Sequence, residues 1–600
     1  MKRILKMAKN RKRKPKTKED EQKKEQRAFR KEIKDFFNTV GFISIPGING
    51  TEFTYENRTS EIDSIYIYEN IVLIVEDTVG KPGEHLLTKK IIFDRINENP
   101  VHFFDFLLTN SKFPFLKKYW DEKNKGKYDL QQLQVKILYC SKKQIDDEHK
   151  KLVENIKYLE YPTLLYFKKL AQVIKRSARY EFFDFLDIAD EYIGDNVLRS
   201  ATSPKATFRG NILPEHHSSF PPGFLVISFY IDAESLLKRA QVLRKGGWKD
   251  TDGDCLYQRM LYPKKIRDMR KFINENDRVF INNIIVTIPV QEINLYDKDS
   301  NLLKITESGT VRADKPLKTD PISVEINDKI NIIGIIDGQH RVYTYHEGND
   351  IYETKIAQLR KKQNLLVTAI LFPKSLSQMD CLKFEAKIFK EINLNQKKVS
   401  AELLQAITTI QKPFSAVAIS RRVLQKLNAS GPLYDVFEML AFDKEKIKIA
   451  TIINYGLMKI VRPDAEDNLF SLWSNPEKNK LKEANKKERT DEQDKILLQE
   501  YITFCFNQIN NLFIAFKDNI GKERWLYRKK NTNRILNVIF INGVIHCLIQ
   551  LIKNKKTGSI EDYRTKLINV GEFDFDKYKG SHYAEMGQDL YQQFFNQSTT

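Results

Sequence analysis

The chain has 600 residues, too many for one hydrophobic core, and a length that suggests about three or four folding units. Hydrophobic residues make up 41% and charged residues 30%, which excludes a globally disordered chain. The 100 Lys and Arg residues against 79 Asp and Glu residues give a net charge of +21. This surplus favours a polyanionic partner such as nucleic acid, although a lysine-rich solvated surface is the alternative.

Two further exclusions concern location and cysteine chemistry. No apolar run approaches the ~18 residues that cross a bilayer, and no secretory signal follows the basic start. We therefore expect a cytoplasmic protein with no membrane partner. The five cysteines show no CxxC spacing, which argues against a disulfide framework or a thiolate zinc site.

The chain begins with a strongly basic segment. Residues 1–18 hold ten cations and no acidic residue, so the rest of the chain still carries +11 (21 less 10). Residues 1–26 lack apolar periodicity, and we expect a disordered basic arm there. Apolar residues then recur at helical spacing from Phe29 to Phe37, which predicts a helix.

An αβ unit is predicted over residues 27–195. Two short strands, 62–68 and 71–75, are joined by a tight turn, and a third strand covers 135–139. Asp63 opens the first strand of this hairpin and Glu76 closes the second. The two carboxylates can therefore converge at one edge of the sheet, where they could hold Mg²⁺ against a phosphate. Solvated acids at a strand end are the alternative.

This order of residues, Asp63…Glu76-Asp77-Thr78 on a hairpin after an early helix, resembles the core of the PD-(D/E)xK nucleases. The resemblance implies a restriction-endonuclease-like domain in which Asp63 and Glu76 bind Mg²⁺. Glu32 on the preceding helix is a candidate third carboxylate.

The lysine of that motif is missing, because Thr78 stands in its place. A threonine hydroxyl cannot replace the charge of the lysine, which positions or activates the attacking water. Lys81 is the first candidate substitute, and Lys89 and Lys90 on the following helix are others. Whether the domain cleaves DNA therefore stays open at this point.

A second α/β unit is predicted over residues 222–410, after a linker of Ser, Pro, His and Thr at 200–222. Strands alternate with helices in this unit. Residues 411–600 have helical periodicity and are expected to form a helical carboxyl-terminal region.

The most informative segment is a buried-type strand, 330–336, that runs into Asp337-Gly338-Gln339-His340-Arg341 and a helix. Gly338 permits a backbone geometry that a Cβ would hinder, and Asp337 could cap the helix. Arg341 lies in the first turn, where the helix dipole disfavours a cation. An anion bound there, such as phosphate, would offset this cost. An ordinary Asp-capped helix with a surface Arg is the alternative.

Asp337-Gly-Gln-His-Arg341 resembles the signature of the DGQHR-domain family, which includes DndB, a regulator found with DNA phosphorothioation systems. Flanking segments extend the resemblance at Tyr257-Gln258-Arg259, at 280–286, and at 389–399, which contains Asn393 and Gln396. The resemblance implies a ParB/sulfiredoxin-like fold in which this turn holds a nucleotide phosphate.

The resemblance also implies roles for single residues. The amides of Gly338 and Gln339, with Arg341 and Arg259, would hold phosphate. Asp337 would cap the helix or bind Mg²⁺, and His340 would donate a hydrogen bond or relay a proton. Asn393 and Gln396 could reach the base or ribose.

Our leading hypothesis is a DNA-associated protein that binds and hydrolyses a nucleoside triphosphate in bacterial DNA modification or phage defence, alongside other proteins of such a system. One alternative is a non-enzymatic, DndB-like transcriptional regulator that grips DNA through the signature turn. Another is an active Mg²⁺-dependent DNA endonuclease. The sequence leaves the oligomeric state open.

Overall fold

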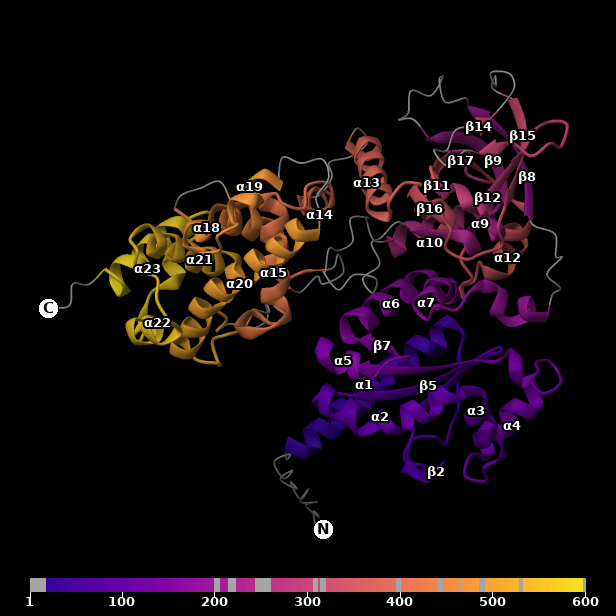
Figure 1. Cartoon of the computed structure of the whole chain (residues 1–600), viewed down its shortest axis with the longest axis horizontal. Coiled ribbons are helices and arrows are strands. Elements are labelled where there is room, and N and C mark those ends of the chain that lie inside the picture. The colour runs from indigo at the N-terminus through magenta and orange to yellow at the C-terminus, as the bar shows by residue number, and fades with distance from the viewer. Residues whose placement is uncertain are drawn as a thin grey trace, which may run out of the picture. The chain divides into compact units, whose positions relative to one another are not determined.

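The computed structural model describes most of the chain, and its residues fall into two compact units (Figure 1). The first unit comprises residues up to 205 together with Asp328–Asn331 and His346–Ala357, and the second comprises the remainder. The described ranges are 18–198, 206–213, 223–242, 261–305, 311–312, 320–394, 401–439, 446–463, 467–484, 492–527 and 533–596. The chain is thus a mixed α/β protein with a helical carboxyl-terminal region.

The first unit is built on a five-stranded sheet of order β1-β4-β5-β6-β7. The β4–β5 hairpin is antiparallel, whereas β6 lies parallel to β5 and β7 lies parallel to β6. The strands and helices are α1 (Lys18–Val40), β1 (Ile43–Ser44), β2 (Phe53–Tyr55), β3 (Arg58–Ser60), β4 (Ser64–Tyr68), β5 (Ile71–Thr78), α2 (Pro82–Glu98), α3 (Pro100–Thr109), α4 (Pro114–Lys123), β6 (Gln134–Ser141), α5 (Asp147–Leu152), β7 (Lys157–Glu160), α6 (Tyr161–Ile174) and α7 (Arg179–Phe185). The predicted hairpin and third strand are therefore confirmed.

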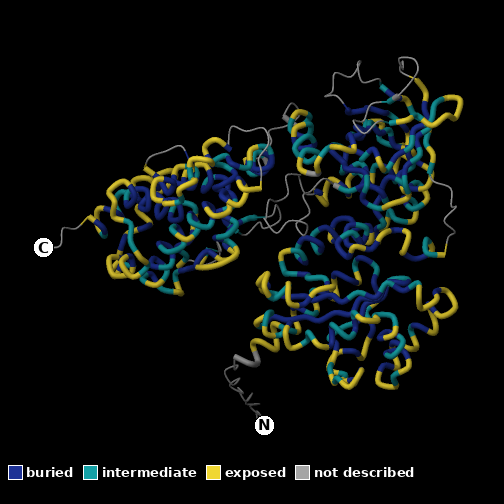
Figure 2. Tube along the Cα trace, viewed as in Figure 1, coloured by how far each residue is buried: buried dark blue, intermediate teal, exposed yellow. Residues whose placement is uncertain are grey.

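Helices cover both faces of this sheet, so that every residue of β5 is buried (Figure 2). On one face, Phe37 of α1 stacks on Tyr66 with ring centroids 4.3 Å apart, and α6 and α7 add further aromatic rings. On the other face, apolar residues of α2, α3 and α4 pack with Val72 and Ile74 of β5. Burial on both faces explains why β5 is a continuous apolar run rather than an alternating one.

The amino-terminal helix begins earlier than predicted. The described part of α1 starts at Lys18, so residues 18–26 are helical and do not belong to a disordered arm. The sequence pattern missed this extension because residues 18–26 are all polar and so give no apolar periodicity. Residues 1–17 lie outside the described part of the chain.

The second unit contains an eight-stranded mixed sheet of order β10-β16-β11-β17-β9-β8-β15-β12. The strands and helices of this part of the chain are β8 (Ala206–Leu213), β9 (Leu225–Asp232), α9 (Ala233–Arg239), β10 (Ala240–Val242), α10 (Pro263–Asn276), β11 (Ile284–Pro289), β12 (Ile293–Tyr296), β13 (Lys304–Ile305), β14 (Val311–Arg312), β15 (Asp320–Ile326), β16 (Ile333–Asp337), α11 (Gln339–Tyr343), α12 (Glu353–Lys362), β17 (Asn364–Phe372) and α13 (Gln378–Leu394). Strands β13 and β14 form a separate two-stranded sheet, and α12 begins in the first unit and ends in the second. The predicted linker is wrong over residues 206–213, which form β8 between β9 and β15.

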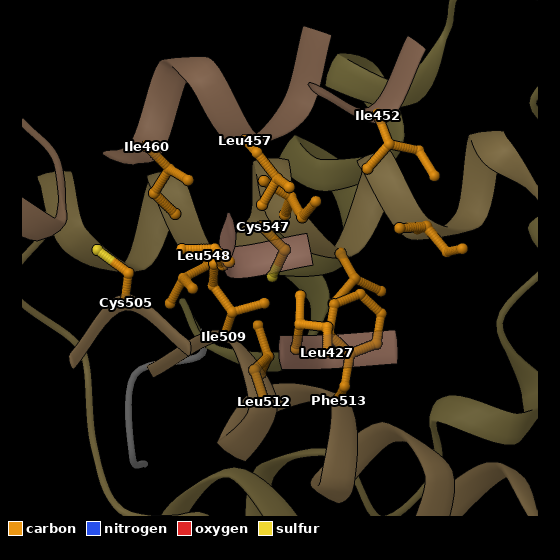
Figure 3. Close-up of a cluster of buried hydrophobic side chains, with 14 of the residues drawn as sticks. Leu427, Ile452, Leu457, Ile460, Cys505, Ile509, Leu512, Phe513, Cys547 and Leu548 are labelled. Carbon is orange, nitrogen blue, oxygen red and sulfur yellow. The ribbon is translucent and has the colours of Figure 1, made fainter. Parts of the chain in front are cut away.

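The helical region buries a large apolar core around α20, as Figure 3 shows for Phe513 and its neighbours. Cys505 and Cys547 lie in this core and are free thiols. The helices are α14 (Ala401–Gln411), α15 (Ala416–Ala429), α16 (Ile449–Ile452), α17 (Met458–Val461), α18 (Leu469–Leu472), α19 (Asn479–Ala484), α20 (Glu492–Ile520), α21 (Val538–Lys553), α22 (Ile560–Lys566) and α23 (Tyr583–Phe594).

A mostly buried ion pair fixes the segment 346–357 within the first unit. Both Glu347 oxygens accept hydrogen bonds from Arg179, at 2.9 and 2.8 Å, and Tyr180 adds a third bond at 3.1 Å. The negative charge nearby raises the pKa of Arg179 despite its burial. The segment is therefore held by charge rather than by apolar packing alone.

We predict that Glu347→Gln loosens this segment locally. Hydrogen bonds to charged groups contribute about 1.5–3 kcal/mol each, so amide exchange in peptides from 346–357 should accelerate by about 10-fold or more in the full chain. Hydrogen–deuterium exchange with mass spectrometry measures this. Glu84→Gln, which breaks the exposed Lys81–Glu84 pair, is the control and should leave these peptides unchanged. Equal exchange in the two variants would contradict the assignment.

Candidate functional site

Acidic side chains gather where the β4–β5 hairpin meets α1 and α2. Asp63 precedes β4, while Glu76 and Asp77 end β5. Successive residues of a strand point to opposite faces, so Glu76 lies toward Lys89 of α2 and Asp77 toward Arg30 of α1. We call Asp63, Glu76 and Lys89 the carboxylate site.

Glu76 is a buried acid beside a partly buried base. Its side chain is 2% exposed, and its Oε1 lies 3.0 Å from the Nζ of Lys89, which is itself only 12% exposed. Lys89 also donates to the carbonyl of Glu61 at 2.8 Å. Burial and the neighbouring Asp63 charge raise the pKa of Glu76 well above its usual value, and Lys89 partly offsets the rise. The site therefore holds a carboxylate that gains from any added positive charge.

Among the three lysines proposed to replace the missing motif lysine, Lys89 is the one that reaches Glu76. Lys81 is exposed and pairs with Glu84, so the structure does not bring it to the carboxylate site. Lys90 pairs with Asp94 at 2.7 Å on the surface of α2. Lys89 and Lys90 are adjacent on α2 and so point in different directions, Lys89 toward the sheet and Lys90 toward solvent. Sequence spacing alone could not tell which of the two would face the sheet.

Arg30 of α1 joins two acids and was not predicted from the sequence. Its Nε lies 2.8 Å from Asp77, and its Nη2 pairs with Asp63. The backbone amide of Asp77 also donates to Asp63, at 2.9 Å, and the Gln26 amide group bonds to Asp77. Burial and the Asp63 charge raise the pKa of Asp77 to about 6, although Arg30 acts against them. Four-residue spacing of Gln26 and Arg30 was the only signal.

Glu32 does not join the carboxylate site as a third ligand. It lies on a different flank of α1, 3.4 Å from Lys168 and 3.8 Å from Lys142. Across the described residues, no three His, Cys, Asp or Glu side chains are grouped to hold a metal ion. A cation here would depend on Asp63 and Glu76, which is compatible with Mg²⁺ because that ion often takes one or two carboxylates and retains water.

His85 and Tyr139 lie on the same side of the sheet as Glu76 and were also missed. His85 precedes Lys89 by one helical turn, and Tyr139 of β6 is the cross-strand partner of Glu76. The Tyr139 hydroxyl donates to the carbonyl of Pro82 at 2.8 Å, so it accepts from Nδ1 of His85 at 2.9 Å. This arrangement leaves Nε2 of a neutral His85 as an acceptor. Burial and Lys89 lower the pKa of His85 and favour this neutral form.

The Asp337–Arg341 turn in the second unit requires glycine at its centre. Gly338 has φ +98°, and a Cβ there would lie 2.9 Å from the Arg341 guanidinium and 3.0 Å from Ile284. Both the backbone conformation and the space therefore exclude larger residues. Gly338 is also the N-cap residue of α11, so Asp337 does not cap the helix.

Asp337 instead supplies the counter-charge that we expected from a ligand. Nη2 of Arg341 lies 3.1 Å from Asp337 Oδ2 and donates to the carbonyl of Asn283 at 2.7 Å. The pair is still open to solvent, since the two side chains are 20% and 32% exposed. Two buried polar atoms at this turn, Nε of Arg341 and Oδ1 of Asn283, have no hydrogen-bond partner among the described residues.

His340 is engaged within the protein. Its Nε2 accepts from the amide of Tyr262 at 3.1 Å, and the two rings stack with an interplanar angle of 9°. Any donation to a ligand would have to come from Nδ1. Arg259 and Gln396 lie outside the described residues, and Asn393 belongs to α13 with its side chain likewise outside the described part.

No protein-family model, curated protein or solved structure matches this chain. Within the described ranges, none of the helices combines the length and apolar character needed to cross a bilayer.

We predict that Glu76→Gln stabilises the metal-free protein at alkaline pH. The pKa of Glu76 is raised in the folded state, so the folded protein binds more protons than the unfolded chain above the usual value of 4.5. The free energy of unfolding therefore falls as pH rises from 4.5 toward the raised pKa, and glutamine removes this slope. Thermal melts in a chelator should show a higher Tm for the variant at pH 8 and a smaller gap at pH 5. Parallel curves for the two proteins would contradict the raised pKa.

Proposed function

We propose that the first unit is a Mg²⁺-dependent nuclease that cleaves DNA, with Asp63 and Glu76 as metal ligands and Lys89 as the lysine of the site. The observation that carries the proposal is the contact between Lys89 and the buried Glu76, 3.0 Å apart beside Asp63. It supplies from α2 the charge that Thr78 lacks in the PD-(D/E)xK pattern.

The residues at the site fit a divalent cation. A buried carboxylate with a raised pKa and a second carboxylate beside it are stabilised by added positive charge. Asp63 has one oxygen engaged by Arg30 and the other by the Asp77 amide. Because each carboxylate oxygen has two lone pairs, Asp63 can keep these bonds and still bind a metal ion.

Each side chain has a separate role in this proposal. A bound Mg²⁺ would supply Lewis-acid stabilisation of the charge that develops on a phosphate. Lys89 partly offsets the raised pKa of Glu76 and can donate a hydrogen bond to an attacking water or a phosphate oxygen. Arg30 brings a permanent cation beside Asp63, where an N–H group not engaged by Asp63 or Asp77 could contact a phosphate oxygen.

DNA as the substrate is supported by charge, because the net +21 of the chain favours a polyanion. The resemblance of the 337–341 turn to the DGQHR-domain family supports an activity in DNA modification or phage defence. The combination describes a DNA-acting enzyme rather than a regulator alone.

If Lys89 is the lysine of the site, replacing either Lys89 or Glu76 by glutamine should reduce DNA cleavage. Lys89→Gln and Glu76→Gln should each lower the rate of Mg²⁺-dependent plasmid nicking by about 10²–10³-fold, the usual cost of losing a charge that stabilises a transition state. Lys90→Gln, one residue along the same helix and paired on the surface, is the matched control and should cut normally.

Metal binding is tested separately from cleavage. MgCl₂ should raise the Tm of the wild-type protein at pH 8 and should not raise that of Glu76→Gln, because the cation relieves the buried carboxylate. The nuclease assignment would be refuted if Glu76→Gln cleaved DNA at the wild-type rate. It would also be refuted if the wild type cleaved no DNA with any divalent metal ion.

A second candidate function, nucleotide binding at the Asp337–Arg341 turn, is favoured by the two buried polar atoms without partners there. A phosphate oxygen could accept a hydrogen bond from Nε of Arg341, while Nη2 of the same guanidinium contacts Asp337. Asp337 could then turn to a magnesium ion bound with the nucleotide. Hydrolysis of the nucleotide would provide a way to control the nuclease.

The nucleotide hypothesis predicts different effects of two substitutions at one position. Arg341→Lys keeps the charge but loses the planar fork, and Arg341→Ala loses both. We expect both variants to lose nucleoside triphosphate binding, by about 10-fold or more for loss of a charge-assisted hydrogen bond worth about 1.5–3 kcal/mol, measured by equilibrium dialysis with labelled nucleotides. Arg278→Ala, which removes a cation packed over Phe272, is the control. If the wild type binds DNA but neither binds nor hydrolyses nucleotides, the DndB-like regulator is the better description of this turn.

A further inference from the structure

The solvent face of α1 carries a row of four cations. Lys24, Arg27, Lys31 and Lys34 follow one another at intervals of three, four and three residues, which places them along one face of the helix. All four are exposed. In the part of the chain that the structure describes, none of them forms an ion pair or a side-chain hydrogen bond. We call these residues the α1 basic stripe.

Three acidic residues of α1 lie on another flank, whereas Asp20, four residues before Lys24, and Asp35, four residues after Lys31, border the stripe at its two ends. Glu21, Glu25 and Glu32 are spaced by four and seven residues and so share a side of the helix. Glu32 on that side meets Lys142 and Lys168. Between residues 24 and 34 the acidic residues, Glu25 and Glu32, are therefore on a different side of the helix from the four cations.

The opposite flank of the stripe borders the carboxylate site. Arg30 precedes Lys34 by four residues and follows Arg27 by three, so it is a surface neighbour of both. Its guanidinium contacts Asp63 and Asp77. The stripe thus leads along one helix to a side chain that touches a predicted metal ligand.

The chemistry of this face fits a phosphate backbone better than a membrane. A helix that lies on a membrane exposes an apolar face, but the apolar residues of α1, such as Phe29, Ile33 and Phe37, are buried against the sheet. From Lys24 to Lys34 the stripe rises by ten residue steps, or about 15 Å at 1.5 Å per residue, and presents several cations to a linear polyanion. The sequence before it adds ten more cations within residues 1–18.

We propose that the α1 basic stripe binds the phosphate backbone of DNA and leads one strand past Arg30 to the carboxylate site. The proposal deepens the nuclease assignment and rests on it for the direction of the strand. DNA binding by the stripe itself does not require that the site cleaves.

The test measures binding without cleavage. Full-length protein carrying Glu76→Gln is titrated in a chelator against a fluorescent DNA duplex, and the Kd is followed by anisotropy over a range of KCl. The stripe variant combines K24Q, R27Q, K31Q and K34Q. The control variant combines K117Q, K118Q, K123Q and K125Q, which removes four exposed cations on or next to α4. Glutamine is a good helix former, and circular dichroism checks that both variants fold.

We expect the stripe variant to bind DNA at least about 10-fold more weakly at 0.1 M salt and to lower the slope of log Kd against log salt by about 3–4, since each phosphate contact contributes about 0.9. The control should retain the wild-type slope. Equal effects of the two variants, or an unchanged slope in the stripe variant, would overturn the proposal. So would binding of the wild type to phosphatidylserine vesicles that the stripe variant loses while its DNA binding is unchanged.

Cleavage assays then separate the two claims. If the stripe variant loses DNA binding but the wild type cuts no DNA, the binding surface stands and the nuclease assignment fails. If the wild type cuts DNA and the stripe variant binds and cuts equally well, the nuclease assignment stands and the stripe proposal fails.

Discussion

The ammonium group of Lys89 lowers the cost of carrying a charged carboxylate inside the first unit. Glu76 lies at the end of the most buried strand of the sheet, where an isolated charge would be several kcal/mol too costly and the acid would take up a proton. Lys89 offsets part of that cost, although Asp63 adds to it, so the pKa of Glu76 stays raised. The proposed chemistry depends on this remaining deficit of positive charge, because a divalent cation would offset it.

The sequence predicted the strands of this site better than its side-chain contacts. Alternation and turn residues located the β4–β5 hairpin, and Asp63 and Glu76 followed from it. The lysine was less predictable, because Lys81, Lys89 and Lys90 differ only in which way α2 turns them, and packing against the sheet decides this. Arg30 was missed because nothing local links it to residues 33 and 47 positions away. Strand β8 was missed because its half-exposed residues lie among Ser, Pro and His, which are typical of linkers.

The Asp337–Arg341 turn shows why a charge at a helix start is weak evidence for a ligand. The sequence argument assumed that a cation there needs an external anion. In the structure the i,i+4 partner Asp337 provides the negative charge, and α11 is only five residues long, so its dipole is small. What remains in favour of a ligand is more specific: Nε of Arg341 and Oδ1 of Asn283 are buried without partners, and leaving such atoms unpaired costs about 1–3 kcal/mol each.

Because α1 is a helix, its side chains form three faces with different surroundings. One face buries Phe29, Ile33 and Phe37 against the sheet, the next holds Gln26 and Arg30 against the acids, and the outermost exposes the basic stripe. These faces are separated by single residues, so sliding or rotating the helix by one position would move Arg30 away from Asp63 and expose apolar side chains together. The apolar packing therefore fixes the position of the cations. A DNA strand bound to the stripe would consequently meet Arg30 and the carboxylate site in a fixed register, without any movement of the helix.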